Sequence, residues 1–261
     1  MNNYTFLVDD PPSFEERLAK LQELVKNAKH IAFFGGAGVS TESGIPDFRS
    51  KDGLYNQHDI HFDKYQPEYL LSHDCLYKEP KVFYEFYRQK FDCRSAKPNI
   101  THLKLAELEN NGKRVSVITQ NVDCLHQKAG SNEVYEIHGT MNRNYCTKCH
   151  REFDINYIFD NIEAIPHCPK CGNVSMVRPD ITMYGEKLPN AYTDACEVLH
   201  HADLMIVAGT SLTVFPAANL TQEFYGDNLV IINRDPTPQD KYAQIVFHEN
   251  LGDIFSQITV D

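Results

Sequence analysis

The amino-acid sequence predicts an α/β protein in which a parallel sheet is covered by helices on both faces. Four short apolar runs, at residues 30–34, 115–118, 204–208 and 229–232, are typical of buried strands. A helical pattern precedes each run, and a glycine turn follows the first one. Strands that alternate with helices in this way are joined by crossover connections, so we expect them to pair in parallel.

The opening helix carries a clear start signal. Ser13 and Glu16 are the two ends of a capping box that follows two prolines. Apolar residues then recur at helical spacing, at Phe14, Leu18, Leu21, Val25 and Ala28. The helix leads into the first apolar run, which enters the turn Gly35-Gly36-Ala37-Gly38.

The helix before the second strand is expected over residues 100–108. Leu103 and Leu105 lie inside it, and Asn111-Gly112 is its stop signal. The strand that follows and the two later apolar runs complete the predicted sheet. The last dozen residues predict a closing helix or strand.

Two stretches interrupt the alternation of helices and strands. Residues 53–98 are rich in aromatic residues and histidine, predict a helix over 80–91 and contain no strand of the core type. Residues 141–177 hold four of the eight cysteines. We interpret both stretches as insertions that form a smaller second lobe.

The spacing of these four cysteines indicates a metal site. Two Cys-x-x-Cys pairs are separated by eighteen residues, within the zinc-ribbon range of about 15 to 20. His150 and His167 adjoin the pairs and could replace a ligand, and four unrelated buried thiols are the other alternative. Four thiolates leave no open position for water or substrate, so the expected zinc is structural. The expected ligands are Cys146, Cys149, Cys168 and Cys171.

A glycine-rich turn from Gly35 to Ser40 follows the first strand. Glycines let the backbone approach a phosphate closely, and the N–H groups of a following helix can hold the anion. The turn lacks a complete G-x-G-x-x-G, so strand-to-helix packing alone is the alternative. The continuation from Thr41 ends in Phe48 and Arg49, an aromatic residue beside an arginine in a Gly/Pro-rich segment, which favours a mobile lid over a cofactor.

Polar residues directly follow three further predicted strands, at 119–123, 209–212 and 233–235. In an open parallel sheet, ligands bind beyond the carboxyl ends of the strands. These positions are therefore well placed to contact ribose hydroxyls or an amide.

His138 follows the short run at 133–137 and precedes the cysteine-rich insertion. Histidine is well suited to proton transfer near neutral pH. In a chain with twelve histidines, any single one more often has a structural role than a functional one. The position of His138 after a strand end nevertheless indicates a site at the interface of the two lobes.

The charge of the chain excludes two classes of partner. Its 261 residues include 25 Lys and Arg against 36 Asp and Glu, for a formal net charge of −11. A general binder of nucleic acid or of membrane surfaces needs a basic face, so we expect neither partner. The charge suits a cationic, lysine-bearing partner.

The sequence predicts a cytoplasmic protein. Residues 1–14 lack the basic-then-apolar pattern of a secretory signal, and no apolar run approaches the roughly 18 residues that span a bilayer. In a reducing compartment, cysteines are metal ligands, catalytic groups or buried apolar residues more often than disulfides. The four cysteines outside the pairs are expected to pack as small apolar residues, and they are Cys75, Cys93, Cys124 and Cys196.

In their order along the chain, these blocks resemble the sirtuin family of NAD-dependent protein lysine deacylases. The matching stretches are GAGVSTESGIPDFRS, TQNVD, the HG of IHG, the paired CxxC, RPDITMYGEKLP, GTSL with VFPAA, and INRD. The resemblance implies a Rossmann-like, NAD-binding lobe built on the parallel sheet, plus a smaller lobe with a zinc ribbon and a helical module. The expected bounds are 1–55, 99–140 and 178–261 for the larger lobe, 56–98 for the helical module and 141–177 for the zinc ribbon.

The resemblance also implies the residues of the site. His138 would be the general base, and Asn121 a second catalytic residue that orders the nicotinamide ribose. The residues expected to contact NAD are Gly35, Ala37, Ser40, Thr41, Phe48, Arg49, Gln120, Asn121, Val122, Asp123, His138, Gly209, Thr210, Ser211, Asn233 and Asp253. A peptide is expected to add as a β-strand along residues 181–186, with contacts at Ile181, Tyr184, Gly185 and Glu186.

The implied reaction consumes NAD as a co-substrate. The acyl oxygen of an acyl-lysine attacks the anomeric carbon of the ribose as nicotinamide leaves. His138, acting through the ribose hydroxyls, then helps a hydroxyl attack the intermediate, and water completes the release of lysine and O-acetyl-ADP-ribose. One zinc ion per chain is structural.

The acyl group is expected to be neutral, most simply acetyl. Family members that prefer acidic acyl groups carry a Tyr-x-x-Arg pair in the small lobe, whereas here Arg88 lies one position too late after Tyr84. Two other functions stay open: mono-ADP-ribosyl transfer from the same NAD site to another nucleophile, and a non-catalytic module that senses NAD or ADP-ribose. The presence of both Asn121 and His138 disfavours the sensing module.

Overall fold

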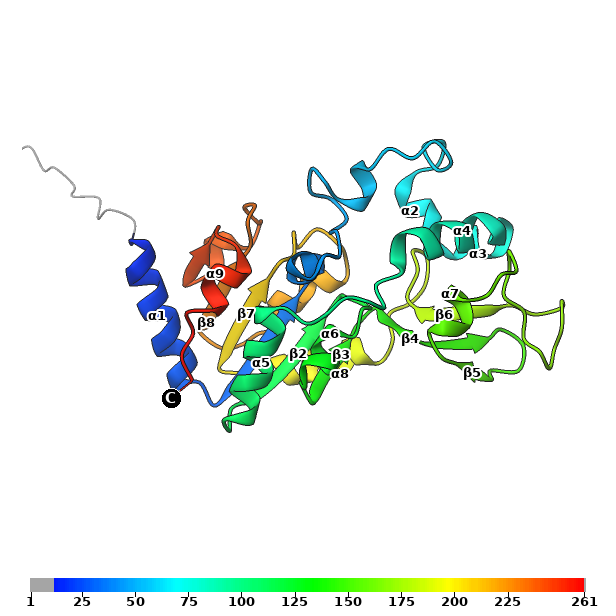
Figure 1. Cartoon of the computed structure of the whole chain (residues 1–261). Coiled ribbons are helices and arrows are strands. Elements are labelled where there is room, and N and C mark those ends of the chain that lie inside the picture. The colour runs from blue at the N-terminus through cyan, green and yellow to red at the C-terminus, as the bar shows by residue number, and fades with distance from the viewer. Residues whose placement is uncertain (1–11, 261) are drawn as a thin grey trace, which may run out of the picture.

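The computed structural model describes residues 12–260 and divides into a larger lobe around a parallel sheet and a smaller lobe at the other end of an elongated molecule (Figure 1). Residues 1–11 and residue 261 lie outside the described residues. Most of residues 1–14, which were expected to lack a secretory signal, are therefore not described. Within the described part of the chain, no helix is long and apolar enough to cross a membrane.

The larger lobe contains a six-stranded sheet in which every neighbouring pair is parallel, in the order β3-β2-β1-β7-β8-β9. The bounds are β1 His30–Gly35, β2 Arg114–Thr119, β3 Glu133–Glu136, β7 Leu204–Ala208, β8 Asn228–Ile232 and β9 Ile245–Phe247. The four predicted core strands are confirmed as β1, β2, β7 and β8. Strand β9 was not predicted, because three residues are too few to show a strand pattern.

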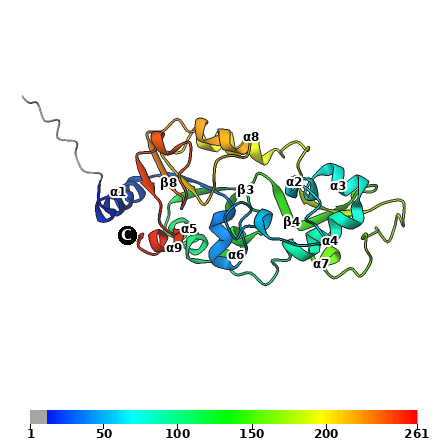
Figure 2. The same cartoon turned by 90° about the horizontal axis from the view of Figure 1, so that it is seen from above.

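Helices cover both faces of this sheet, as predicted, with α8 on one side and α5, α6 and α9 on the other (Figure 2). The bounds are α1 Phe14–Asn27, α5 Ile100–Asn110, α6 Leu125–Ala129, α8 Ala191–Leu199 and α9 Leu251–Phe255, with 3-10 helices η1 Ala37–Ser43, η3 Ala217–Gln222 and η4 Asp240–Tyr242. Alternate residues of β1 pack into two apolar cores, one on each face of the sheet. Ile31 and Phe33 pack with residues of α1, α5 and α9, whereas Ala32 and Phe34 pack with residues of α8 and η3.

Local signals in the sequence set several helix ends. The capping box at α1 is present, because the N–H of Ser13 donates to Oε2 of Glu16 at 2.8 Å and the N–H of Glu16 donates to Oγ of Ser13 at 3.2 Å. Helix α5 ends two residues before Gly112, which has the left-handed φ of 90° that stops a helix. Both predictions are confirmed.

The smaller lobe joins an antiparallel sheet, of order β5-β4-β6, to a group of short helices. The bounds are β4 Gly139–Cys146, β5 Glu152–Phe153 and β6 Val177–Ile181, with η2 Leu54–Asn56, α2 Pro67–Leu70, α3 His73–Lys78, α4 Pro80–Phe91 and α7 Asn156–Phe159. The helix predicted over 80–91 is confirmed as α4. The lobe boundaries expected at 140/141 and 177/178 fall inside β4 and β6, since the small sheet extends past the cysteine-rich stretch.

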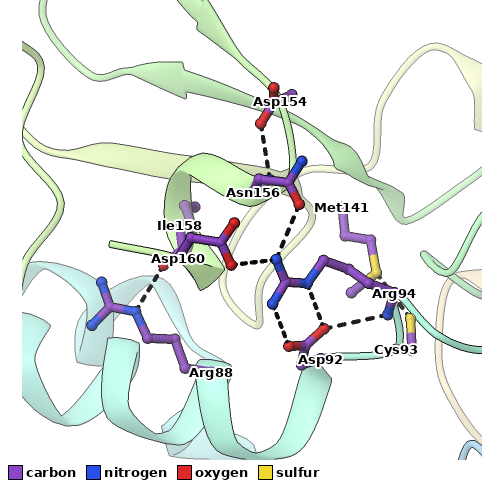
Figure 3. A network of polar contacts seen from close by, with 9 residues as sticks. All are labelled: Arg88, Asp92, Cys93, Arg94, Met141, Asp154, Asn156, Ile158 and Asp160. Atoms are coloured by element: carbon purple, nitrogen blue, oxygen red, sulfur yellow. Dashed lines mark hydrogen bonds and ion pairs between the residues drawn. The ribbon is translucent and has the colours of Figure 1, made fainter. Parts of the chain in front are cut away.

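Arginine side chains fasten the helical module to the zinc ribbon (Figure 3). Arg94, just after α4, donates to Oδ1 of Asn156 at 3.0 Å and to Oδ1 of Asp160 at 2.6 Å. Arg88, within α4, donates from Nε to the carbonyl oxygen of Ile158 at 2.9 Å. The two insertions are therefore linked to each other at α7.

Two histidines are buried side by side between α5 and α6. The rings of His102 and His126 lie 4.6 Å apart, and the His126 ring packs edge-on against Phe33. His102 is fully buried and His126 is 1% exposed, and neither ring nitrogen of His126 has a hydrogen-bond partner within residues 12–260. Burial lowers the pKa of His102 to about 4 and that of His126 well below 6.5. Both rings are therefore neutral at pH 7.

We expect the protein to lose stability as the pH falls from about 6.5 toward 4. In that range the unfolded chain binds protons at both histidines and the folded chain does not, so the free energy of unfolding decreases, by up to about 1.4 kcal/mol per pH unit for each histidine. Denaturant unfolding measures this free energy at about pH 8 and about pH 5. Between these two pH values, the free energy of unfolding of His126→Leu should decrease less than that of the wild type.

The matched control is His58→Gln, since the side chain of His58 is 97% exposed. It should keep the pH dependence of the wild type. An equally steep loss of stability in His126→Leu would contradict the role of the buried pair.

Candidate active site

A cleft of about 670 Å³ lies between the two lobes, at the carboxyl ends of β1, β2, β7 and β8. The smaller lobe contributes an apolar wall that includes Leu71, Phe91 and Met141. The predicted site residues that line the cleft are Ala37, Ser40, Thr41, Phe48, Arg49, Gln120, Asn121, Val122, Asp123, His138, Ile181, Tyr184, Gly185, Glu186, Gly209, Thr210, Ser211 and Asn233. The fold thus brings together residues that are separated by up to about 200 positions in the sequence.

Two residues expected to contact NAD, Gly35 and Asp253, do not line the cleft. Gly35 is the buried last residue of β1, and its carbonyl oxygen accepts the N–H of Gln120 at 3.0 Å. Asp253 lies in α9, where its carboxylate accepts Nδ2 of Asn250 at 3.2 Å. Asn250 and Leu251, close to Asp253 in the sequence, do line the cleft. Contacts of Gly35 and Asp253 with NAD therefore stay predictions.

The glycines after β1 allow two turns of the chain to pack against each other. The N–H of Gly38 donates to the carbonyl oxygen of Gly209 at 2.8 Å, and a Cβ on Gly38 would lie 2.8 Å from Cα of Gly209. A Cβ on Gly36 would lie 2.6 Å from Cβ of Thr210. Packing between the turns after β1 and β7 therefore accounts for both glycines, and it places Ala37 near Thr210 in one cleft.

A buried hydrogen-bond network joins the turns after β1 and β2. The hydroxyl of Ser40 donates to Oδ2 of Asp123 at 2.7 Å and accepts Nδ2 of Asn121 at 3.0 Å. Burial raises the pKa of Asp123, and the hydrogen bond from Ser40 opposes that shift. The network holds the Asn121 amide in one orientation at the cleft wall.

The His138 ring is half-buried and held by the backbone of the preceding strand end. Its Nδ1 lies 3.1 Å from the carbonyl oxygen of Gln120. Because a carbonyl oxygen only accepts hydrogen bonds, the proton resides on Nδ1 and Nε2 is the basic nitrogen. Burial lowers the pKa of His138, partly offset by this hydrogen bond. At neutral pH the ring is therefore an uncharged proton acceptor.

Gln120 connects three parts of the site. Its backbone N–H donates to Gly35, its carbonyl oxygen accepts Nδ1 of His138, and its side-chain Nε2 donates to Oγ1 of Thr210 at 3.0 Å. The ends of β1, β2 and β7 and the His138 ring are thus tied to one residue.

The segment from Asp47 to Tyr55 forms one side of the cleft. The rings of Phe48 and Tyr55 lie 5.3 Å apart, and the guanidinium carbon of Arg49 lies 5.5 Å from the centre of the Tyr55 ring. Tyr55 was not among the predicted site residues. Its place in the sequence could have indicated it, because Tyr55 lies six residues after Arg49 in the same glycine-containing segment.

The four cysteines of the two pairs form a cluster in which all Sγ atoms lie within 4.8 Å of one another. Sγ of Cys149 and Sγ of Cys168 are 3.8 Å apart. A zinc ion with bonds of about 2.3 Å to four tetrahedral thiolates requires sulfur–sulfur distances of about 3.8 Å. The donor set therefore fits zinc, and neither His150 nor His167 belongs to the cluster.

The remaining cysteines are poor nucleophiles. Burial raises the pKa of Cys75 and of Cys93 to about 12, and that of Cys124 to about 11. Burial also raises the pKa of Cys196. All four thiols are therefore protonated at neutral pH, which agrees with the expected packing role.

Comparison with known proteins decides the family. A family model described as the Sir2 family matches residues 36–216, more than half of the chain. The chain belongs to the Sir2, or sirtuin, family. Two curated relatives named NAD-dependent protein deacetylase, from Clostridium tetani and Staphylococcus epidermidis, are each 47% identical to it, over 91% and 92% of this chain and 95% and 96% of their own.

A solved sirtuin structure supports the same assignment. A Sir2 complex with a deacetylated peptide and 3′-O-acetyl ADP ribose superposes with a TM-score of 0.83 at 35% identity, covering 92% of this chain and 96% of its own. The sirtuin match along the sequence includes His138 and both Cys-x-x-Cys pairs. Sirtuins use NAD, and the four-cysteine cluster fits their structural zinc.

We expect one zinc ion per chain, measured by plasma mass spectrometry of the purified protein. Cys171→Ser removes one of four thiolates and should lower the zinc content to well below one ion per chain, with a lower melting temperature because the ion stabilises the small lobe. Cys196→Ser, a half-buried cysteine outside the cluster, is the control and should retain one ion. A wild-type chain that is folded and active without zinc would contradict this prediction.

Proposed function

We propose that this sirtuin is an NAD-dependent protein lysine deacetylase. It moves the acetyl group of an acetyl-lysine side chain to ADP-ribose and releases nicotinamide, free lysine and O-acetyl-ADP-ribose. The observation that carries the proposal is the meeting of three features in one cleft: the neutral His138, the polar strand ends of the sheet, and the segment 181–186.

NAD occupies the part of the cleft that the larger lobe forms. Residues after β1, β2, β7 and β8 supply backbone and side-chain polar groups for the dinucleotide, and Phe48 and Arg49 cover it from the other side. Asn121 orders the nicotinamide ribose, since Ser40 holds its amide in place.

His138 is the general base. Its Nδ1 is occupied by the carbonyl oxygen of Gln120, which leaves Nε2 to accept a proton from a ribose hydroxyl. The carbonyl oxygen of His138 accepts the N–H of Thr182 at 2.8 Å. The base is therefore anchored on both sides, at its ring and at its backbone, before substrate binds.

The peptide binds beside residues 181–186. Most amide groups of this segment are already paired: the N–H of Thr182 with His138, that of Met183 with Glu186, and that of Tyr184 with Leu71. Gly185 is exposed, and no hydrogen bond within residues 12–260 uses its N–H. Gly185 is therefore the donor that supports main-chain pairing with a peptide carbonyl.

The substrate is an acyl-lysine protein or peptide, and we propose no nucleic-acid or membrane partner. The net charge of −11 supports a cationic partner and disfavours a phosphate-rich one. We also propose a cytoplasmic location, because protonated, unpaired cysteines suit a reducing compartment.

We expect the purified protein, given NAD and an acetyl-lysine peptide, to release nicotinamide. The mass of the peptide should decrease by that of one acetyl group. His138→Ala should lower kcat by at least about 100-fold, the usual contribution of a general base. Mass spectrometry of the peptide and assay of nicotinamide check both results.

The control is His201→Ala, at an exposed histidine outside the cleft, which should keep wild-type activity. A gain of ADP-ribosyl mass on the peptide would support ADP-ribosyl transfer instead. Binding of NAD without any release of nicotinamide would support the sensing module. Full activity in His138→Ala would refute the assigned base.

The acyl preference follows from where Tyr84 and Arg88 lie. Tyr84 is fully buried and donates its hydroxyl to the carbonyl oxygen of Val177 at 2.8 Å, and Arg88 donates to Ile158. Neither residue lines the cleft. Of the residues of α4, Lys90 and Phe91 line the cleft, and Nζ of Lys90 is already paired with Oδ2 of Asp59 at 3.5 Å. A carboxylate buried there without a partner of its own is costly.

We expect kcat/KM for an acetyl-lysine peptide to exceed that for the succinyl-lysine peptide of the same sequence by at least about tenfold, because Lys90, the cation of α4 that lines the cleft, is already paired with Asp59. A propionyl peptide, neutral and only slightly larger, is the matched control and should resemble the acetyl peptide. Equal or faster removal of succinyl would contradict the neutral-acyl preference.

A further inference from the structure

The segment from Asp47 to Tyr55 is closed by its own hydrogen bonds. The N–H of Leu54 donates to the carbonyl oxygen of Asp47 at 2.7 Å, and the N–H of Tyr55 donates to that of Phe48 at 2.9 Å. Oδ1 of Asp47 accepts the N–H of Arg49 at 3.0 Å. The two residues proposed to cover NAD, Phe48 and Arg49, therefore belong to the same small unit as Tyr55.

The Tyr55 side chain is half-buried inside this unit. Its ring packs against Phe48 and lies beneath the guanidinium group of Arg49. Such aromatic and cation–π contacts fix the direction of a side chain. The hydroxyl of Tyr55 consequently points out of the unit, to within 3.2 Å of the hydroxyl of Tyr184.

Tyr184 belongs to the segment proposed to bind the peptide, and its backbone is held by the smaller lobe. Its N–H donates to the carbonyl oxygen of Leu71, and its own carbonyl oxygen accepts the N–H of His73, both at 3.0 Å. Its side chain faces the other way, where Nη2 of Arg49 lies 3.5 Å from the same hydroxyl. The Tyr184 hydroxyl is thus the meeting point of the peptide segment and the unit that covers NAD.

We propose that Tyr55 is a positioning residue that couples the binding of NAD to the binding of the acyl-lysine peptide through its hydroxyl contact with Tyr184. This inference rests on the proposed function. Tyr55 is not a member of the predicted site, and its role is to place Phe48 and Arg49 relative to the peptide segment.

The physical basis is shared ordering. A peptide that orders Tyr184 also fixes one partner of the hydroxyl contact, so less freedom remains to be lost when NAD orders the Phe48 and Arg49 segment. Coupling between two binding sites is reciprocal. Bound NAD or ADP-ribose must therefore increase the affinity for the peptide by the same factor as the peptide increases the affinity for NAD or ADP-ribose. The Tyr55 hydroxyl keeps its proton at neutral pH, since burial and the hydrogen bond with Tyr184 raise the pKa of Tyr55.

The test measures this coupling directly in the full chain by calorimetry. The dissociation constant of an acetyl-lysine peptide is determined without and with saturating ADP-ribose, which carries no nicotinamide and cannot react. The ratio of the two constants is the coupling factor, and the wild type should bind the peptide more tightly with ADP-ribose. Tyr55→Phe removes only the hydroxyl and should reduce the factor by about two- to tenfold, the range for one hydrogen bond.

The double variant identifies the partner. Tyr184→Phe removes the hydroxyl that Tyr55 and Arg49 both contact, so it should reduce the coupling factor at least as much as Tyr55→Phe. Adding Tyr55→Phe to Tyr184→Phe should then have no further effect, as expected for two groups that act through one contact. Effects that multiply in the double variant would overturn the proposal.

Tyr225→Phe is the matched control, because Tyr225 is 69% exposed, stacks on His200 and lies outside the cleft. It should keep the wild-type coupling factor. A factor of one in the wild type, or an unchanged factor in Tyr55→Phe, would overturn the inference. A failure of the proposed function would give a different result. The wild type would then release no nicotinamide in the presence of NAD and the peptide, whatever its coupling factor.

Discussion

Parallel pairing of the four central strands is the constraint on which the site depends. In the register of the sheet, Gly35 ends β1 opposite Thr119 of β2 and Ala208 of β7, and Ala208 in turn lies opposite Ile232 of β8. The chain therefore leaves all four strands at one edge. Because both faces of these strands are buried, a slip of one residue would exchange the two apolar cores. The register that protects the cores also fixes the residues that face the cleft.

The second requirement is the change from the parallel sheet to the small antiparallel sheet, and His138 stands at that change. The N–H of Ile137 still pairs with Thr119 of β2, whereas Gly139 already begins β4. Gly139 has a φ of 77°, and a side chain there would collide with the carbonyl oxygen of Asp180. The proposed general base is thus positioned by two sheets, and the four-cysteine cluster lies at the far end of the smaller one.

Burial acts in opposite senses on two titratable groups of the cleft, His138 and Asp123. It lowers the pKa of His138 and raises that of Asp123, because each charged form is less well solvated there. Hydrogen bonds to Gln120 and Ser40 oppose these shifts and orient the side chains. The cleft therefore contains a neutral proton acceptor and a hydrogen-bonded carboxyl group, both held by strand-end residues. Neither arrangement could be derived from the residue types alone.

The sequence by itself determined the elements and the family. Periodicity, the Ser13 capping box and paired cysteines are local properties, so the core strands, α4 and the zinc ligands could be predicted from them. Strand β9 has no pattern of its own and was not predicted. Position along the chain does not say which way a residue faces, so only the structure shows that Gly35 is buried at the end of β1 and that Asp253 lies in α9 outside the cleft. Only the tertiary structure decided that Tyr55 meets Tyr184, since 129 positions separate them and contacts at such separation depend on how whole lobes pack.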